Sequence, residues 1–280
     1  MKNRIYASHW EDYELIDAGN GLKLERWGKY ITVRPDVNAY FQPQLSKQEW
    51  DRKAHFIFKE DKGVFGTWLN KGNLPLNWDI EFEGVRLSVF LKNTKHTGIF
   101  PEQNLNWKAI KEFITSEASF LNLFGYTGAS SMMALANQAN VFHVDSSKSA
   151  LTWTKENARL NKFDGCKLVL EDVVLFMERE IKRKHQYELI QMDPPAWGIG
   201  TKGKKWQLEN HIDLLMSLAA QLLTPKGQLI VSTYSAKITP LTLKETAEIY
   251  FPNRTFKTGM LATKSTTGKA LDHGSLLHIF

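Results

Sequence analysis

Three segments in the middle of the chain each combine a buried strand with residues that can bind a ligand at its end. The first, FLNLFGYTGASSMMALA, passes from a strand through a glycine turn into a helix. The second, VFHVDSS, ends its strand at an acid, and the third, YELIQMDPPAWG, ends in Asp-Pro-Pro. In a parallel α/β sheet the carboxyl ends of the strands meet at one edge, where ligands bind. The pattern predicts an α/β, Rossmann-like sheet with these three ends around one crevice.

The glycine turn contains Gly125 and Gly128. Glycine lets the backbone turn tightly and lets a ligand approach main-chain amides without a Cβ in the way. An ordinary strand-to-helix turn is the alternative, because a short glycine pair is a weak signal alone. Asp145, twenty positions after Gly125 (145 minus 125), strengthens the ligand interpretation. An acid at this place in such a fold binds the two ribose hydroxyls of a nucleotide cofactor.

Acids at the next strand ends leave two alternatives open. Asp145 begins the run DSSKSALTWTKENARLN, so it could also start a helix as a solvated acid. Asp172 ends the strand LVLED, where its side chain could accept the amino hydrogen of an adenine. Glu171 beside it is an alternative for that role.

Asp193, Pro194 and Pro195 carry the most chemistry. The two prolines fix the backbone and remove two donors, which leaves carbonyl groups for a ligand. The aspartate can accept a hydrogen bond, or a proton, from an amine that is being methylated. Methyl transfer from a positive sulfur needs alignment more than a metal or a strong acid. These residues predict a catalytic crevice for methyl transfer from S-adenosylmethionine; a proline-stiffened loop is the alternative.

A nicotinamide-dependent dehydrogenase is the rival enzyme class, since it also uses a glycine turn and an acid. It would prefer a third glycine that seats a pyrophosphate at the start of the helix. Here Ala129, Ser130 and Ser131 follow Gly128, and Asp-Pro-Pro has no evident role in hydride transfer. The methyltransferase interpretation is therefore favoured.

Composition limits the setting of this chemistry. The chain has 280 residues, one cysteine and a net charge of +6. One cysteine excludes an internal disulfide framework and a cysteine-rich metal site, so we expect no metal. No apolar run is long enough to cross a bilayer and no signal peptide is evident, so we expect a soluble, cytoplasmic protein without a membrane partner. The mild basic excess favours a polyanionic partner without requiring one.

Two styles of patterning predict two domains, a small β-rich domain over residues 1–94 and a cofactor-binding domain over residues 95–280. The first part has short strand-like runs, including WDIEFEGVRLSVFLK, whose apolar positions alternate around Gly84. Its one helix is predicted from the Ser46 cap, Glu49, and the spacing of Trp50, Ala54 and Phe58. Strand and helix alternate in the second part, as in a parallel sheet. The tail, FKTGMLATKSTTGKALDHGSLLHIF, predicts a hairpin turned at Gly268.

Residues 95–107, KHTGIFPEQNLNW, join the two parts. Turn residues and the position between domains favour a linker. The functional alternative is a segment that folds back over the cofactor, with Phe100 packing on a ring and Gln103 donating or accepting a hydrogen bond.

The motifs together resemble the class I S-adenosylmethionine-dependent methyltransferases of the bacterial ribosomal-RNA type, and more narrowly the group around the large-subunit rRNA cytosine-5 methyltransferases. The matching runs are HTGIFPEQ, LNLFGYTGASS, VDSSKSALTWTKENARLN, MDPPAWG and LLTPKGQLIVSTYS. The resemblance implies S-adenosylmethionine as cofactor, and places Asp193 and Pro194 near the transferred methyl. It implies cofactor contacts from Thr97, Gly98, Phe100, Gln103, Phe124, Gly125, Thr127, Gly128, Asp145, Ser146, Asp172 and Asp193.

One departure from that group concerns its nucleophile. Cytosine C5 is activated by a cysteine thiolate that adds to the adjacent ring carbon. In the matching strand end, VSTYS, this chain has Tyr234 where the cysteine of the group would stand. The single thiol, Cys166, lies near the start of a strand, at the opposite edge of the sheet from the crevice. We therefore do not expect cytosine-5 methylation through a thiolate, while a nitrogen or oxygen acceptor stays open.

The acceptor side is predicted from the residues after Asp-Pro-Pro. Trp197 could stack on a flipped-out base, and Lys202, Lys204 and Lys205 beside Trp206 suit a phosphate backbone. The alternative is a solvated, mobile loop. We expect structured RNA, ribosomal RNA first, as the acceptor, with Trp197, these lysines and Tyr234 as its contacts. A small-molecule or protein acceptor, and binding without turnover, are the alternatives; a homodimer is compatible with the sequence.

Overall fold

The computed structural model describes residues 3–62, 65–199 and 205–280, which contacts divide into two compact units. The large unit consists of Met1–Ile5, Leu105–Leu261 and Gly274–Phe280. The small unit consists of Tyr6–Asn104 and Ala262–His273. Among the helices of the described residues, none is long and apolar enough to cross a membrane.

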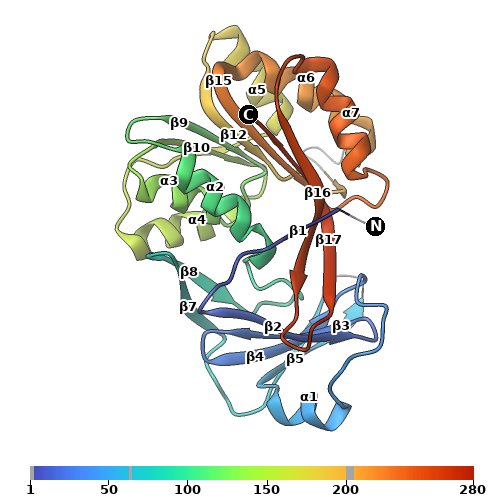
Figure 1. Cartoon of the computed structure of the whole chain (residues 1–280). Helices are drawn as coiled ribbons and strands as arrows, with labels where there is room; N and C mark the ends of the chain where they lie inside the picture. The colour runs from blue at the N-terminus through green and yellow to red at the C-terminus, as the bar shows by residue number, and fades with distance from the viewer. Residues whose placement is uncertain (1–2, 63–64, 200–204) are drawn as a thin grey trace. The chain divides into compact units, whose positions relative to one another are not determined.

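An eight-stranded sheet forms the centre of the large unit (Figure 1), in the order β1-β16-β17-β15-β12-β9-β10-β11. The strands from β15 to β11 are parallel to their neighbours, and β17 is antiparallel to β15. From β9 the chain moves to β10 and β11 on one side and then crosses to β12 on the other. The strand order thus reverses at β9, which is the position where open α/β sheets bind ligands. The strands are β1 (Arg4–Tyr6), β9 (Ser119–Leu123), β10 (Asn140–Asp145), β11 (Lys167–Leu170), β12 (Tyr187–Met192), β15 (Leu223–Thr233), β16 (Phe256–Lys264) and β17 (Ala270–Ile279).

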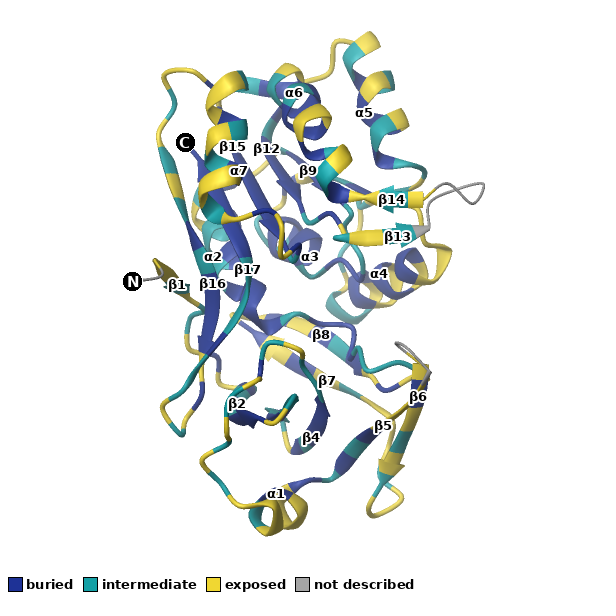
Figure 2. Ribbon diagram, turned by 90° about the vertical axis from the view of Figure 1, so that its right-hand side faces the viewer, coloured by how far each residue is buried: buried dark blue, intermediate teal, exposed yellow. Residues whose placement is uncertain are grey.

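Helices cover both faces of this sheet, as expected for parallel strands that are buried on both sides. One face carries an apolar core between the strands and three helices, α5, α6 and α7, seen as buried residues in Figure 2. On the other face, Asn106 of α2 donates to Ser232 Oγ of β15 over 3.0 Å, and α3 and α4 continue the layer. The helices are α2 (Asn104–Phe113), α3 (Ala129–Ala136), α4 (Lys148–Asn161), α5 (Val173–Lys182), α6 (Ile212–Leu222) and α7 (Pro240–Tyr250).

A short two-stranded ribbon follows β12, and a single 3₁₀ turn leads from it to α6. Strands β13 (Trp197–Ile199) and β14 (Lys205–Gln207) pair antiparallel, and the 3₁₀ turn covers Leu208–Asn210. Leu208 is fully buried in the apolar core. The base of the ribbon is therefore tied to the sheet.

The described residues of the small unit are β-rich with one α-helix, as predicted. It contains a five-stranded sheet, β2 to β6, and a separate hairpin, β7–β8. A capping box joins Ser46 and Glu49 at the start of the helix, also as predicted. Its elements are β2 (Tyr13–Gly19), β3 (Leu22–Trp27), β4 (Tyr30–Pro35), α1 (Lys47–Lys53), β5 (Phe56–Lys62), β6 (Phe65–Asn70), β7 (Asn77–Phe82), β8 (Val85–Phe90) and a 3₁₀ turn (Pro101–Gln103).

The predicted helical spacing extends too far, because Phe58 lies in β5 and not on the helix. Helix α1 ends at Lys53, and His55 already pairs with β4: its amide donates to the Ile31 carbonyl over 2.9 Å. The Ile31 amide donates in return to Nδ1 of His55 over 3.0 Å. Sheet pairing thus overrides the apolar spacing that continued the helix.

The predicted hairpin around Gly84 is confirmed. Gly84 has a φ of 83°, in the left-handed region that favours glycine. The five alternating apolar side chains are all buried, namely Ile80, Phe82, Val85, Leu87 and Val89.

The C-terminal hairpin is also present, and it explains how the units divide. Its turn contains Gly268, with a φ of 99°, and Ser265 N donates to the Lys269 carbonyl over 2.7 Å. Residues 262–273 of this hairpin belong to the small unit, where Thr267 Oγ1 donates to Asp17 Oδ1 over 2.8 Å. Residues 95–104 belong there too, so the division differs from the predicted boundary between residues 94 and 95. Contacts between residues 250 positions apart carry no local sequence signal.

Candidate functional site

The carboxyl ends of the central strands are joined by hydrogen bonds between their loops. Tyr126 N, in the turn after β9, donates to Asp145 Oδ2 at the end of β10 over 2.9 Å. Asp193 N, after β12, donates to the Leu123 carbonyl of β9 over 3.3 Å, and Glu171 N donates to the Asp145 carbonyl over 3.2 Å. The structure therefore brings the glycine turn, Asp145 and Asp193 to one edge of the sheet.

The two glycines of the turn are required by close packing. A Cβ on Gly125 would lie 2.3 Å from Cε1 of His143, and one on Gly128 would lie 2.4 Å from Cγ2 of Thr154. Gly128 also has a φ of 83°. The sequence suggested that these glycines make room for a ligand; the space beside their α-carbons is instead filled by protein side chains. Phe124 and Tyr126 also have positive φ values, 55° and 50°, and such unfavourable backbone is typical of functional turns.

Two side chains of helix α4 hold the glycine turn by donating hydrogen bonds to carbonyl groups of the turn. Thr154 Oγ1 donates to the Tyr126 carbonyl over 2.9 Å, and Asn157 Nδ2 donates to the Thr127 carbonyl over 2.9 Å. Both side chains are fully buried. Sequence reasoning missed them, although they are three positions apart and so share one face of a helix that otherwise buries apolar residues.

A buried network behind the turn contains His143 of β10. Its Nδ1 lies 2.9 Å from Ser131 Oγ of α3, and its Nε2 lies 3.2 Å from Thr154 Oγ1. Asn122 Nδ2 donates to the same serine oxygen over 2.9 Å. Burial lowers the pKa of His143 from 6.5 to about 4, so the ring is neutral near pH 7. We call Asn122, Ser131, His143 and Thr154 the neutral network.

Asp145 is held in place by backbone amides. Besides the bond from Tyr126, its Oδ1 accepts from Ser147 N over 2.7 Å. Burial raises the pKa of its carboxyl, while these two bonds act in the opposite direction. The N-cap of α4 is Ser147, which accepts from Ala150 N, so the alternative that Asp145 caps this helix is wrong. A fixed, half-buried carboxylate at this position retains lone pairs for hydroxyl groups.

The two acids after β11 have different surroundings. Glu171 forms an ion pair with Arg179, at 2.6 Å between Oε2 and Nη1. Asp172 caps α5, with Oδ1 accepting from Val174 N over 3.0 Å and from Leu175 N over 3.3 Å. Asp172, and not Glu171, lines a cavity beside the strand ends.

That cavity has apolar and aromatic walls with two polar side chains among them. A flat base packs well between apolar walls, and a few placed polar groups can fix its orientation. The hydroxyl of Ser146 and the carboxylate of Asp172, with Asp145 directly before Ser146, have the chemistry that the adenosine part of S-adenosylmethionine requires. The lining residues are Phe124, Ser146, Asp172, Val173, Pro195, Gly198 and Trp206.

The Asp-Pro-Pro segment connects β12 to the ribbon, and its Pro195 lines this cavity. Asp193 is half-buried, Pro194 is buried and Pro195 is exposed. The Pro195 carbonyl accepts a hydrogen bond from Trp206 Nε1 over 2.7 Å. The prolines were expected to leave carbonyl groups to a ligand, but this one already binds the protein.

The predicted acceptor contacts are placed unequally. Trp197 is 63% exposed, Lys205 is exposed and Tyr234 is half-buried just after β15. Lys202 and Lys204 lie outside the described residues. Cys166 precedes β11, at the amino end of that strand, and burial raises its pKa to about 12. A thiol with this pKa is protonated near neutral pH.

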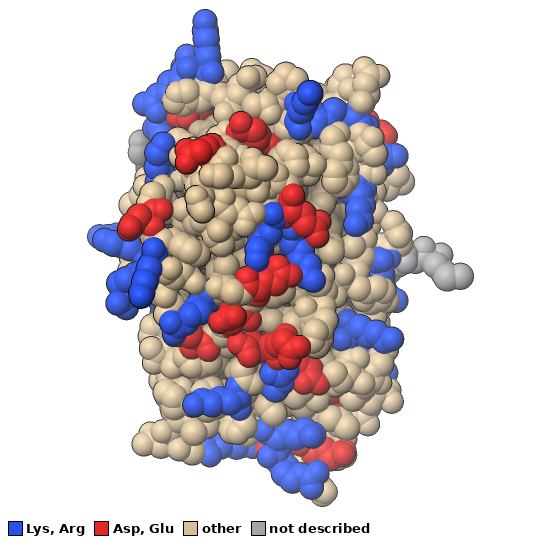
Figure 3. All heavy atoms as spheres, turned by 60° about the vertical axis from the view of Figure 1, so that its left-hand side comes forward, with Lys and Arg blue, Asp and Glu red and all other residues tan. Residues whose placement is uncertain are grey.

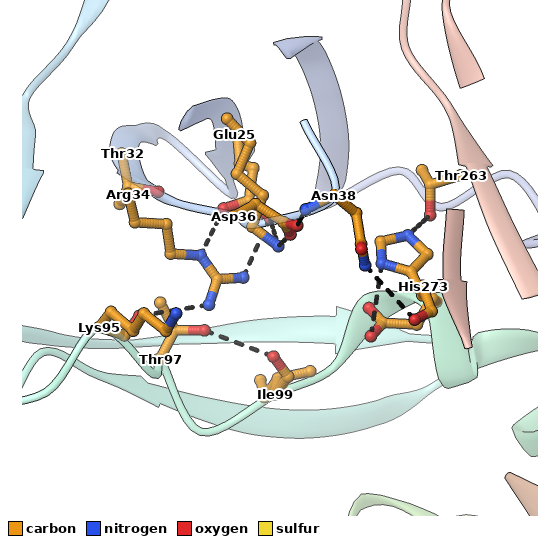
Figure 4. Close-up of polar contacts among 12 residues, drawn as sticks. Glu25, Thr32, Arg34, Asp36, Asn38, Lys95, Thr97, Ile99, Thr263 and His273 are labelled. Atoms are coloured by element: carbon orange, nitrogen blue, oxygen red, sulfur yellow. Dashed lines mark hydrogen bonds and ion pairs between the residues drawn. The ribbon is translucent and has the colours of Figure 1, made fainter. Parts of the chain in front are cut away.

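The predicted cofactor contacts Thr97, Gly98, Phe100 and Gln103 lie in the small unit. Their segment is fixed there by Arg34, whose Nη1 donates to the Lys95 carbonyl over 3.2 Å (Figure 4). Thr97 and Gln103 are buried, and Gly98 has a φ of 93°. The part that this segment plays toward the cofactor stays a prediction.

Arg34 is itself part of a buried ionic cluster. It pairs with Glu25, at 2.5 Å between Nε and Oε2, and Lys23 Nζ lies 3.4 Å from Glu25 Oε1 and 3.1 Å from Asp36 Oδ2. Burial would raise the pKa of Glu25, but Arg34 and Lys23 together hold it below its ordinary value. We call Lys23, Glu25, Arg34 and Asp36 the ionic cluster.

Comparison with known proteins gives consistent results. A model of the family described as "S-adenosylmethionine-dependent methyltransferase" matches residues 53–259. A solved structure, the SAM-dependent methyltransferase from Agrobacterium tumefaciens, is 33% identical with a TM-score of 0.93, covering 99% of this chain and 92% of that one. Ribosomal RNA large subunit methyltransferase I of Aeromonas salmonicida is 33% identical over 234 residues, or 78% of this chain. Ribosomal RNA large subunit methyltransferase K/L of Syntrophotalea carbinolica is 36% identical over 150 residues.

The chain spans 58% of the length of the first of these rRNA methyltransferases and 20% of the second. The matches confirm the predicted resemblance, and the solved structure confirms the predicted fold class.

Proposed function

Because this chain belongs to the S-adenosylmethionine-dependent methyltransferase family, we propose that it transfers a methyl group from S-adenosylmethionine to a base of structured RNA, with ribosomal RNA as the first candidate. The family identifies the cofactor, in agreement with the sequence prediction. The single observation that carries the proposal is the convergence of the glycine turn, Asp145 and Asp193 at the strand-order reversal.

Each side chain at this edge has a role in the proposal. Asp145 accepts hydrogen bonds from the ribose hydroxyls, since its carboxylate is already oriented by two amides. Asp172 accepts from the adenine amino group, and the cavity walls pack on the ring. Asp193 accepts a hydrogen bond from the nucleophile, which orients its lone pair toward the methyl carbon. Bound S-adenosylmethionine supplies a methyl group activated by the positive sulfur.

An acceptor with its own lone pair is favoured over cytosine C5. Tyr234 occupies the strand end where the cytosine-5 enzymes have a cysteine, and the raised pKa of Cys166 argues against a thiolate. A ring nitrogen, an exocyclic amine or an oxygen needs no covalent activation. We therefore propose nitrogen or oxygen methylation.

RNA is favoured as the acceptor class by charge and by the surface near Asp193. The net charge is +6, although Figure 3 shows acidic as well as basic side chains over the face drawn. A general basic field thus gives less support than the exposed Trp197 and Lys205 close to the Asp-Pro-Pro segment. The two rRNA methyltransferases among the relatives support the same acceptor class.

The test is transfer of a labelled methyl group into total RNA from cells that lack the gene. Wild-type protein should label RNA, and Asp193→Ala should lower the rate at least about 100-fold, the usual contribution of a positioned acid or base. Asp164→Ala is the matched control, because Asp164 is exposed in the loop before β11, away from the carboxyl ends of the strands. Full activity of Asp193→Ala would refute the role of this aspartate, and label in protein or small molecules alone would refute the RNA acceptor.

A further inference from the structure

The β13–β14 ribbon has two faces with different chemistry. Paired residues of an antiparallel ribbon lie on the same face, and neighbours along a strand lie on opposite faces. Gly198 pairs with Trp206, and Trp197 pairs with Gln207. Gly198 and Trp206 therefore share one face, whereas Trp197, Lys205 and Gln207 belong to the other.

The face of Gly198 and Trp206 lines the cavity assigned to adenosine. Three contacts hold the Trp206 ring there. Its Nε1 donates to the Pro195 carbonyl over 2.7 Å, its ring stacks on His211 at 4.2 Å between centroids, and it lies 5.5 Å from the Phe124 ring. At the base of the ribbon, Leu208 N donates to the Ala196 carbonyl over 3.1 Å.

The described residues of the opposite face are exposed, and Figure 2 colours parts of both strands as exposed. Trp197 is 63% exposed, and Lys205 and Gln207 are exposed with it. An aromatic ring and a lysine on the same face of a ribbon match an unstacked base and its phosphate. The chemistry is complementary to single-stranded nucleic acid.

We propose that this ribbon couples the two substrates: its Trp206 face closes on the cofactor and its Trp197 face binds an unpaired nucleotide of the RNA. The proposal rests on the proposed function and adds Trp206 as a positioning residue. A two-stranded ribbon is marginally stable by itself and needs packing on one face. A ligand that packs on Trp206 therefore stabilises the ribbon that presents Trp197, and RNA affinity rises when the cofactor cavity is filled. By linkage, RNA raises cofactor affinity by the same factor.

The experiment measures binding of a fluorescein-labelled, unstructured decaribonucleotide of mixed sequence to the full chain, with and without saturating S-adenosylhomocysteine. Wild-type protein should bind the RNA about fivefold or more tightly in the presence of S-adenosylhomocysteine, the lower end of measured coupling between sites. Trp206→Leu should reduce this ratio toward one, and Trp206→Phe, which keeps a ring but loses the hydrogen bond to Pro195, should give an intermediate ratio. A variant that is less stable but still folded would keep the wild-type ratio of RNA affinities with and without S-adenosylhomocysteine. This ratio therefore distinguishes a positioning role of Trp206 from a role in folding alone.

The outer face is tested by two further changes. Trp197→Ala should weaken RNA binding about 5- to 150-fold, the range for one stacked base, while Trp197→Phe recovers most of the affinity. Lys205→Ala should lower the slope of log affinity against log salt by about one, and Lys226→Ala, an exposed lysine at the start of β15, should leave it unchanged.

The other outcomes would each contradict one part of the account. No uptake of S-adenosylhomocysteine would overturn the proposed function itself. Two results would overturn the coupling proposal alone, provided that S-adenosylhomocysteine binds normally. One is an RNA affinity that is the same with and without S-adenosylhomocysteine, and the other is an RNA affinity that is unchanged by Trp197→Ala. Equal binding of labelled polyglutamate in place of RNA would show that the outer face recognises acidic polypeptides.

Discussion

One buried polar cluster in each unit holds a backbone segment, and the two clusters differ in charge. Behind the glycine turn of the large unit, the neutral network is made of hydroxyl, amide and imidazole groups. Behind the segment 95–103 of the small unit, the ionic cluster is made of full charges. Each holds a backbone segment that the sequence assigns to the cofactor.

The neutral network and the ionic cluster should differ in how far the loss of one side chain destabilises them. Neutral partners cost less to bury, and their removal leaves one unpaired dipole. Buried ions depend on one another, since removing one partner leaves a charge without compensation in a medium that solvates it poorly. We therefore expect the small unit to fail abruptly on loss of one charge, and the large unit to weaken gradually with pH or packing.

The largest effect is expected from Arg34→Met. The change leaves Glu25, which is fully buried, without its main cation, and should lower the free energy of unfolding by about 3–5 kcal/mol. The double change Glu25→Met with Arg34→Met should recover most of that loss, because no unpaired charge remains. Urea denaturation followed by circular dichroism measures both. Arg159→Met is the control, since Arg159 is 80% exposed in its pair with Glu156. Equal losses in the single and double variants would show that packing, and not charge, supports the cluster.

Acid should weaken the large unit through His143. Its pKa in the folded state, about 4, lies below its ordinary value of 6.5, so the unfolded chain takes up a proton first as pH falls. Its contribution is complete above pH 6.5 and is lost as pH drops through 4, about 3 kcal/mol in all at about 1.4 kcal/mol per pH unit. The difference in unfolding free energy between wild type and His143→Gln, measured from pH 7 to 4, should shrink by that amount. Parallel curves would contradict the neutral network.

Gly125→Ala tests the packing of the same network. The added Cβ would overlap the His143 ring, so the unfolding free energy should fall by about 1–3 kcal/mol. Gly72→Ala is the control, because its nearest neighbour would be Leu74 Cγ at 3.5 Å, an ordinary contact. If Gly125→Ala were as stable as wild type while cofactor binding was lost, the glycine would serve the ligand, as the sequence first suggested.

The smallest effect is expected from Cys166→Ser. The thiol is protonated and lies at the amino end of its strand, so the rate of methyl transfer should not change. Loss of activity in this variant would restore a thiolate mechanism.

The sequence predicted those features of the fold and the site that follow from local patterns. Strand ends rich in glycine, acid or Asp-Pro-Pro identified the edge of the sheet, and alternation identified the β7–β8 hairpin. The sequence could not predict the roles of His143 and Thr154 in the neutral network. A histidine in a strand and a threonine in a helix form this network only with partners that folding brings close. Trp206 seemed part of a basic loop, but in the structure it pairs with Gly198 and both residues line the cavity.

The central claim is that the carboxyl ends of β9, β10 and β12 bind the cofactor, with Asp145 at its ribose. Isothermal titration calorimetry of S-adenosylhomocysteine into wild-type protein and Asp145→Ala tests it most directly. We predict saturable binding by the wild type and at least about a tenfold loss of affinity in the variant, the cost of one charge-assisted hydrogen bond or more. No binding by the wild type, or equal binding by both proteins, would contradict the account.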